Sequence, residues 1–170
     1  MNRSPPVEPA SRAAELVALY RATVYGVELP DGSVANIRIG APAPAPLRAW
    51  IGAAPCAWYL TACNPFSEPL PERANAKRMA ALRDELERRG CRFLPGVAAI
   101  PNAAWREPSF LVAGIAESAV DDLLDRFGQN AAVRVPADGP ALLRVQRLDW
   151  RGRVDPAADL EWRVGDVQPA

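Results

Sequence analysis

Apolar residues in the second half of the chain form short runs that are separated by two segments with helical periodicity. Residues 57–62 form a nearly continuous apolar run, which predicts a strand buried on both faces. Residues 116–127 repeat apolar side chains at spacings of three and four, which predicts an amphipathic helix ending at Gly128. The predicted order is strand 57–62, helix 71–89, strand 91–100 interrupted at Pro95-Gly96, strand 109–114, helix 116–127, strand 131–135 and a further strand 141–145.

The order β-α-β-β-α-β predicts an α+β protein with a ferredoxin-like split core. The segments ahead of this core and the last strand add to it: an N-terminal helix at 11–21, a β-hairpin formed by 24–29 and 34–39, an extended linker at 41–46 and the extra C-terminal strand 141–145. We therefore expect a disordered segment at residues 1–9, one α+β domain at 10–150 with its core at 57–146, and an irregular tail at 151–170.

Composition narrows the class of protein. The hydrophobic fraction of 49% suffices for a core, and no apolar run has the length of a membrane span. The N-terminus lacks the apolar stretch of a secretory signal, so we expect a cytoplasmic location and no membrane partner. Twenty basic side chains balance twenty acidic ones, which disfavours nucleic acid as a partner. The arginines at 144–153 are interleaved with Asp149, as on an ordinary solvated face.

The absence of histidine removes several kinds of chemistry. Histidine-based triads and most catalytic zinc sites need that side chain. The cysteines Cys56, Cys63 and Cys91 contain no CxxC pair, so we expect no metal site and no cofactor. Cys63 has no histidine to activate it and is interpreted as a packing residue.

The predicted topology places polar residues from four separated segments at one end of the sheet. In chain order they are Asn64, then Asn75 and Arg78, then Glu107 and Ser109, and last Gln129 and Asn130. A helix turns about 100° per residue, so Asn75 falls on the apolar stripe of Met79 and points inward. An inward amide needs hydrogen-bond partners, and Arg78 with Glu107 is a candidate charge-assisted pair.

Four motifs resemble a known family. They are Tyr-Leu-Thr-Ala-Cys-Asn-Pro-Phe-Ser at 59–67, Asn75 with Arg78, Trp-Arg-Glu-Pro-Ser at 105–109 and Phe-Gly-Gln-Asn-Ala at 127–131. In this order they are similar to the bacterial family called domain of unknown function 3293, over about residues 57–146. No activity is established for this family, so the resemblance does not suggest one for this chain. It marks Asn64, Pro65, Asn75, Arg78, Glu107, Ser109, Gln129 and Asn130, whereas the family commonly has an aromatic residue in place of Cys63.

Two functions fit this pattern. In the first, the polar residues bind a small anionic or amide-bearing molecule, with Arg78 holding a carboxylate or phosphate and Glu107 as the only candidate general base. In the second, the chain is a non-catalytic protein-interaction or regulatory module, and the same residues form a structural hydrogen-bond network. The pattern decides neither between binding and catalysis nor between a monomer and an oligomer.

Overall fold

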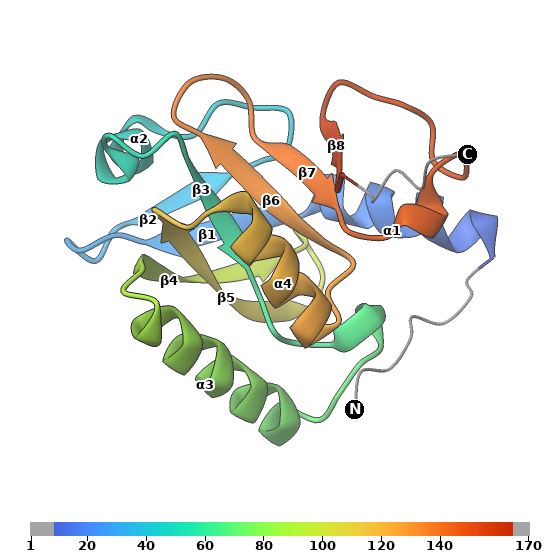
Figure 1. Cartoon of the computed structure of the whole chain (residues 1–170), viewed down its shortest axis with the longest axis horizontal. Helices are drawn as coiled ribbons and strands as arrows, with labels where there is room; N and C mark the ends of the chain where they lie inside the picture. Colours follow the sequence, from blue (N-terminus) through green and yellow to red (C-terminus); the bar gives the residue numbers. More distant parts are fainter. Residues whose placement is uncertain (1–8, 165–170) are drawn as a thin grey trace.

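The computed structural model describes residues 9–164, which form an α+β structure with four α-helices and one eight-stranded sheet (Figure 1). The helices are α1 (Ala10–Ala22), α2 (Ala45–Ile51), α3 (Glu72–Arg88) and α4 (Glu117–Phe127). The strands are β1 (Val24–Glu28), β2 (Val34–Ile37), β3 (Cys56–Leu60), β4 (Arg92–Ala99), β5 (Arg106–Ala113), β6 (Ala131–Pro136), β7 (Leu142–Val145) and β8 (Leu160–Trp162). Short 3-10 turns occupy Pro65–Ser67 and Leu148–Trp150.

The sheet has the strand order β2-β1-β4-β5-β3-β6-β7-β8 and curls strongly. Its neighbours are antiparallel except for β7 and β8, which run parallel. The segment that follows β2 returns to the start of β7, where the Gly40 amide donates to the Ala141 carbonyl at 2.8 Å. Ala141 in turn donates to the Ala41 carbonyl at 2.9 Å. The curl therefore brings distant strands of the order into contact around a shared interior.

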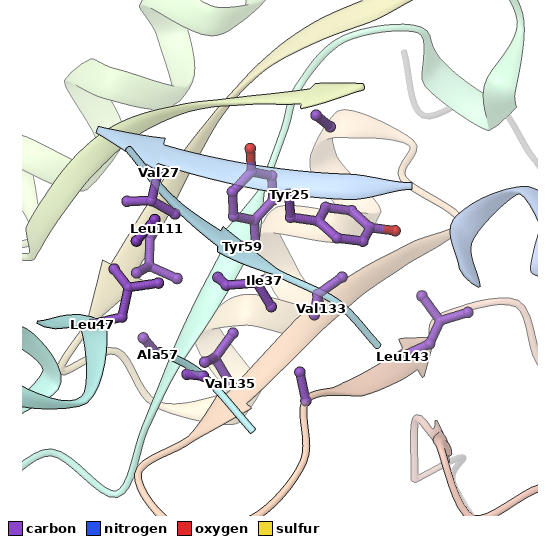
Figure 2. Packing of buried hydrophobic residues seen from close by; sticks show 14 of the residues in the cluster. Tyr25, Val27, Ile37, Leu47, Ala57, Tyr59, Leu111, Val133, Val135 and Leu143 are labelled. Atoms are coloured by element: carbon purple, nitrogen blue, oxygen red, sulfur yellow. The ribbon is translucent and has the colours of Figure 1, made fainter. Parts of the chain in front are cut away.

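Two apolar clusters form on opposite faces of the sheet because side chains along a strand alternate in direction. On one face, α3 and α4 cover Trp58 and Leu60 of β3. The other face forms the interior of the curl, where Ala57 and Tyr59 of β3 pack with residues of α1, α2, β1 and β2. Figure 2 shows the rings of Tyr25 from β1 and Tyr59 from β3 side by side in this interior. Strand β3 is therefore buried on both faces, as its apolar run predicts.

The ends of helices α3 and α4 follow the sequence closely. Helix α3 begins after Pro71 with Glu72 in its first turn, where a carboxylate opposes the positive end of the helix dipole. Helix α4 ends at Gly128, whose φ of 63° is the left-handed conformation that glycine adopts without strain. These ends fix where the chain enters α3 and leaves α4, and hence where Asn75, Gln129 and Asn130 lie.

Three features differ from the predicted elements. Helix α2 begins inside the segment predicted as an extended linker, since Pro46 suits a first helical turn and Leu47 and Ile51 are both buried there. Strand β4 continues through Pro95, which lies just beyond the last β1–β4 pair, so its missing N–H interrupts no ladder on that side. Strand β8 forms within the segment predicted as an irregular tail.

Other predictions concern the chain ends and the arginines. The N-terminal segment predicted to be disordered lies outside the described residues, apart from Pro9. No helix among residues 9–164 is long and apolar enough to cross a membrane. The sequence pattern predicts a solvated face for Arg144, and this prediction is wrong: its side chain is only 1% exposed and pairs with Glu117, Asp121 and Glu161.

Candidate functional site

The segment that follows β3 has an unusual backbone. Asn64, Phe66 and Ser67 adopt positive φ angles of 45°, 56° and 60°. Asparagine tolerates this region, but each of the other two costs about 1 kcal/mol. Tertiary hydrogen bonds hold the segment in place, including one at 2.7 Å from the Phe66 amide to the carbonyl of Gly128. Strain that the surroundings enforce in this way is a known property of functional sites.

A directed chain of hydrogen bonds runs from Asn75 through Asn64 to Glu107. The Asn75 Nδ2 donates to Asn64 Oδ1 at 2.8 Å, and Asn64 Nδ2 donates to Glu107 Oε2 at 2.7 Å. Asn64 Oδ1 also accepts from the Leu70 amide at 3.0 Å, and Asn75 Oδ1 accepts from the Asn64 amide at 2.9 Å. The two donors on Asn64 Oδ1 fix the orientation of that amide, so Glu107 must act as an acceptor.

Arg78 does not pair with Glu107, contrary to the candidate ion pair. Its Nε donates to the carbonyl of Ala62 at 2.6 Å, and its Nη2 donates to the carbonyl of Phe127. The guanidinium therefore ties the end of β3 to the end of α4. A planar fork reaches both carbonyls from the flank of α3, and this geometry leaves Glu107 without its expected cation.

Gln129 and Asn130 also hold the strained segment. Gln129 Nε2 donates to the carbonyl of Cys63 at 2.8 Å. Asn130 Nδ2 donates to the Ser67 hydroxyl at 2.9 Å, and its Oδ1 accepts from Arg147 Nη1 at 3.2 Å. Both side chains are buried. They clamp the loop after β3 against the start of β6.

A cavity of about 330 Å³ opens beside this network, inside one end of the curled sheet. Of the predicted site residues, Asn64, Glu107, Ser109 and Gln129 line it. Asn75, Arg78 and Asn130 lie behind the wall and hold it in position. The four predicted segments thus meet at one end, and they divide into residues that line the cavity and residues that support its wall.

Several lining residues are not among the predicted site residues, although Tyr59, Thr61 and Trp105 lie within the motifs that resemble the family. They come from α1, β1, β3, the segment after β3 and the loop before β5 and include Arg12, Leu19, Tyr20, Tyr25, Tyr59, Thr61 and Trp105. Tyr25 and Tyr59 make an edge-to-face contact with ring centroids 5.2 Å apart (Figure 2). Alternation in the strands indicates that both tyrosines share a face, but only the curl of the sheet brings the two strands together.

Burial shapes the electrostatics of the cavity. It raises the pKa of the Glu107 carboxyl, and the hydrogen bond from the Asn64 amide opposes this rise. Burial also raises the pKa of the Cys63 thiol, which keeps it protonated and weakly nucleophilic. The interpretation of Cys63 as a packing residue agrees with its 1% exposure.

The structure is a mixed α+β fold with a cavity, lined in part by polar residues, at one end of a curled sheet. Within this chain, residues 60–132 match the family model described as "Protein of unknown function (DUF3293)", and the predicted family resemblance is thereby confirmed over that segment. No curated protein and no solved structure matches the chain. The matched segment contains all seven predicted site residues, whereas α1, β1 and β7, which also contribute lining residues to the cavity, lie outside it.

Proposed function

We propose that the cavity binds a small molecule that donates hydrogen bonds to Glu107 and places an apolar body against the tyrosines. The observation that carries this proposal is the directed chain from Asn75 through Asn64, which ends on a carboxylate that lines the cavity. A volume of about 330 Å³ suits a molecule with one ring. Of the two kinds of ligand expected from the sequence, the proposal retains the amide-bearing molecule and drops the anionic one. Arg78, which was to hold the anion, bonds to main-chain carbonyls and does not line the cavity.

A specific observation favours the alternative as well. Arg78 and Gln129 bond to main-chain carbonyls, and Asn75 bonds to Asn64 and to the Leu70 carbonyl at 3.3 Å. Such contacts suit a structural hydrogen-bond network in a non-catalytic protein-interaction or regulatory module. The two functions differ in whether they require a cavity: a binding site needs one, whereas a purely structural network does not.

Benzamide is the probe that tests the proposal. In a titration followed by amide ¹⁵N–¹H NMR, it should shift resonances of residues 61–67, 98–109 and 129–133, which surround the cavity. The matched variants are Ala98→Val, whose added methyl groups would enter the cavity, and Ala99→Val, the next residue of β4, which points to the other face. We expect Ala98→Val to weaken benzamide binding about tenfold or more, whereas Ala99→Val leaves it unchanged.

Two results would support the alternative function instead. One is an absence of shifts at millimolar benzamide. The other is a set of shifts confined to the outer face around Val34 and Val97, which do not line the cavity.

We propose that β3 to β6 with α3 and α4 form a ferredoxin-like core, which the antiparallel order β4-β5-β3-β6 supports. The remaining strands extend this core on both sides. The domain limits 10–150 and the cytoplasmic location remain predictions.

A further inference from the structure

The two charged side chains that line the cavity do not pair with each other. Among the described residues, Glu107 and Arg12 are the only charged side chains that line it. Arg12 stands on α1 with its side chain 42% exposed and 3.9 Å from Glu15. Glu107 has no basic partner among residues 9–164, and its hydrogen-bond partner Asn64 is neutral. Removing a carboxylate from water without a counter-charge costs desolvation free energy. No basic side chain offsets this cost at Glu107, so a ligand cation would do so.

The neutral polar atoms of the cavity point to the same ligand class. A hydroxyl has one hydrogen to donate. The hydroxyl hydrogens of three lining residues are already donated to main-chain carbonyls: Tyr25 to Tyr20 at 2.8 Å, Tyr59 to Gly26 at 3.0 Å and Thr61 to Pro108 at 2.9 Å. The oxygens of these side chains can therefore only accept further hydrogen bonds. These three oxygens and the Glu107 carboxylate are acceptors, and such a group of atoms selects a ligand that donates hydrogen bonds.

Aromatic side chains complete the environment. Tyr25 and Tyr59 lie inside the cavity, and Trp105, which is 39% exposed, stands at its mouth with Leu19. Aromatic faces attract cations within about 6 Å, and their edges pack against apolar groups. A ligand with a cationic head and an apolar or aromatic body would satisfy both parts of this lining.

We infer that the molecule recognised at Glu107 is a small organic cation, with an ammonium or amidinium group at the carboxylate and an apolar body between the tyrosines and the mouth of the cavity. This inference rests on the proposed function, because it specifies the ligand class of the same cavity. It assigns Glu107 the role of counter-ion. Asn64 and Asn75 are positioning residues, because they hold the carboxylate through the hydrogen-bond chain.

Three probes of nearly equal size and shape test the inference: benzamidine, benzamide and benzoate. They carry a positive charge, no charge and a negative charge on the same ring. By NMR titration at pH 7.5, benzamidine should bind at least tenfold more tightly than benzamide, and benzoate should bind more weakly than either. In Glu107→Gln, which preserves size, the ratio between benzamidine and benzamide should fall to about two or less.

The matched control is Glu28→Gln on β1, an exposed carboxylate that does not line the cavity, and it should keep the full ratio. Equal affinity for benzamidine and benzamide, or a preference for benzoate, would overturn the cation inference and leave the proposed binding function intact. Failure of all three probes to shift the cavity resonances would overturn both. A benzamidine preference that survives in Glu107→Gln would also overturn the inference.

Discussion

Asn64 Nδ2 lies 2.7 Å from Glu107 Oε2 and joins the end of β3 to the start of β5. The bond crosses 43 positions of sequence, and it has a fixed direction because Asn64 Oδ1 already accepts from Asn75. The network therefore does more than satisfy free main-chain groups at the ends of helices. It orients one carboxylate toward the cavity, and its members differ in what their removal should do.

Removal of the Asn75 side chain should destabilise the fold. In Asn75→Ala, the Asn64 main-chain N–H loses its acceptor and Asn64 Oδ1 loses one of its donors. We expect a loss of about 1–3 kcal/mol in the free energy of unfolding, measured by urea denaturation. Lys77→Ala is the control, because Lys77 is exposed on the same helix and should change stability by less than about 0.5 kcal/mol. Equal effects of the two substitutions would contradict the structural role of Asn75.

Replacement of Arg78 by lysine should also be costly, although it retains the charge. Lysine cannot reach the Ala62 and Phe127 carbonyls with the planar fork of a guanidinium. We expect Arg78→Lys to lower the free energy of unfolding by about 1–3 kcal/mol. Arg73→Lys, an exposed change on α3, serves as the control. An Arg78→Lys protein as stable as the control would show that charge alone matters at this position.

The sequence predicts the polar residues at this end of the sheet better than it predicts the cavity. Asn75 could be placed because helical rotation puts it on the stripe of Met79, and Asn64 because it follows a strand that is apolar throughout. Both inferences use local geometry. The partners of Arg78 could not be placed in the same way, because the Phe127 carbonyl belongs to the end of another helix and carries no side-chain signal.

The cavity depends on the curl of the sheet. Tyr25 and Tyr59 belong to β1 and β3, between which β4 and β5 lie in the strand order. They meet only because the sheet closes on itself near Gly40 and Ala141. Such closure is a property of the whole sheet and leaves no periodic pattern in the chain. Helical periodicity likewise does not indicate that α1 forms part of the cavity wall.

Gly96 is predicted to be intolerant of any side chain. Its φ angle is ordinary, so the constraint is steric: a Cβ atom there would overlap the Gly26 carbonyl oxygen and lie 2.9 Å from the Tyr59 hydroxyl. We expect Gly96→Ala to cost about 1–3 kcal/mol and to weaken the Tyr59–Gly26 hydrogen bond. Thermal denaturation measures the cost, and Val97→Ala on the same strand, at a side chain that is 44% exposed, is the control. A tolerated alanine would mean that β1 and β4 separate easily.

The raised pKa of Glu107 predicts a particular dependence of stability on pH. Since the folded state holds this proton more tightly than the unfolded state, stability falls as the pH rises from the ordinary pKa of about 4.3 through the raised pKa. Glu107→Gln cannot ionise and escapes this fall. We therefore expect the variant to gain stability relative to the wild-type protein over that window, with a constant difference above it. Urea midpoints from pH 3 to pH 8 measure the effect.

Glu85 provides the opposite comparison. Hydrogen bonds from Arg89, Arg88 and Arg126 lower the pKa of its carboxyl to about 2. Its stabilising contribution is present above the ordinary pKa of a glutamate and is lost as the pH falls toward 2. Glu85→Gln should thus be less stable than the wild-type protein at pH 7 by about 1–3 kcal/mol, and the difference should shrink in acid. If Glu107→Gln instead followed the Glu85→Gln profile, Glu107 would have a cationic partner in solution. The conclusion that Glu107 lines the cavity without a basic partner would then be wrong.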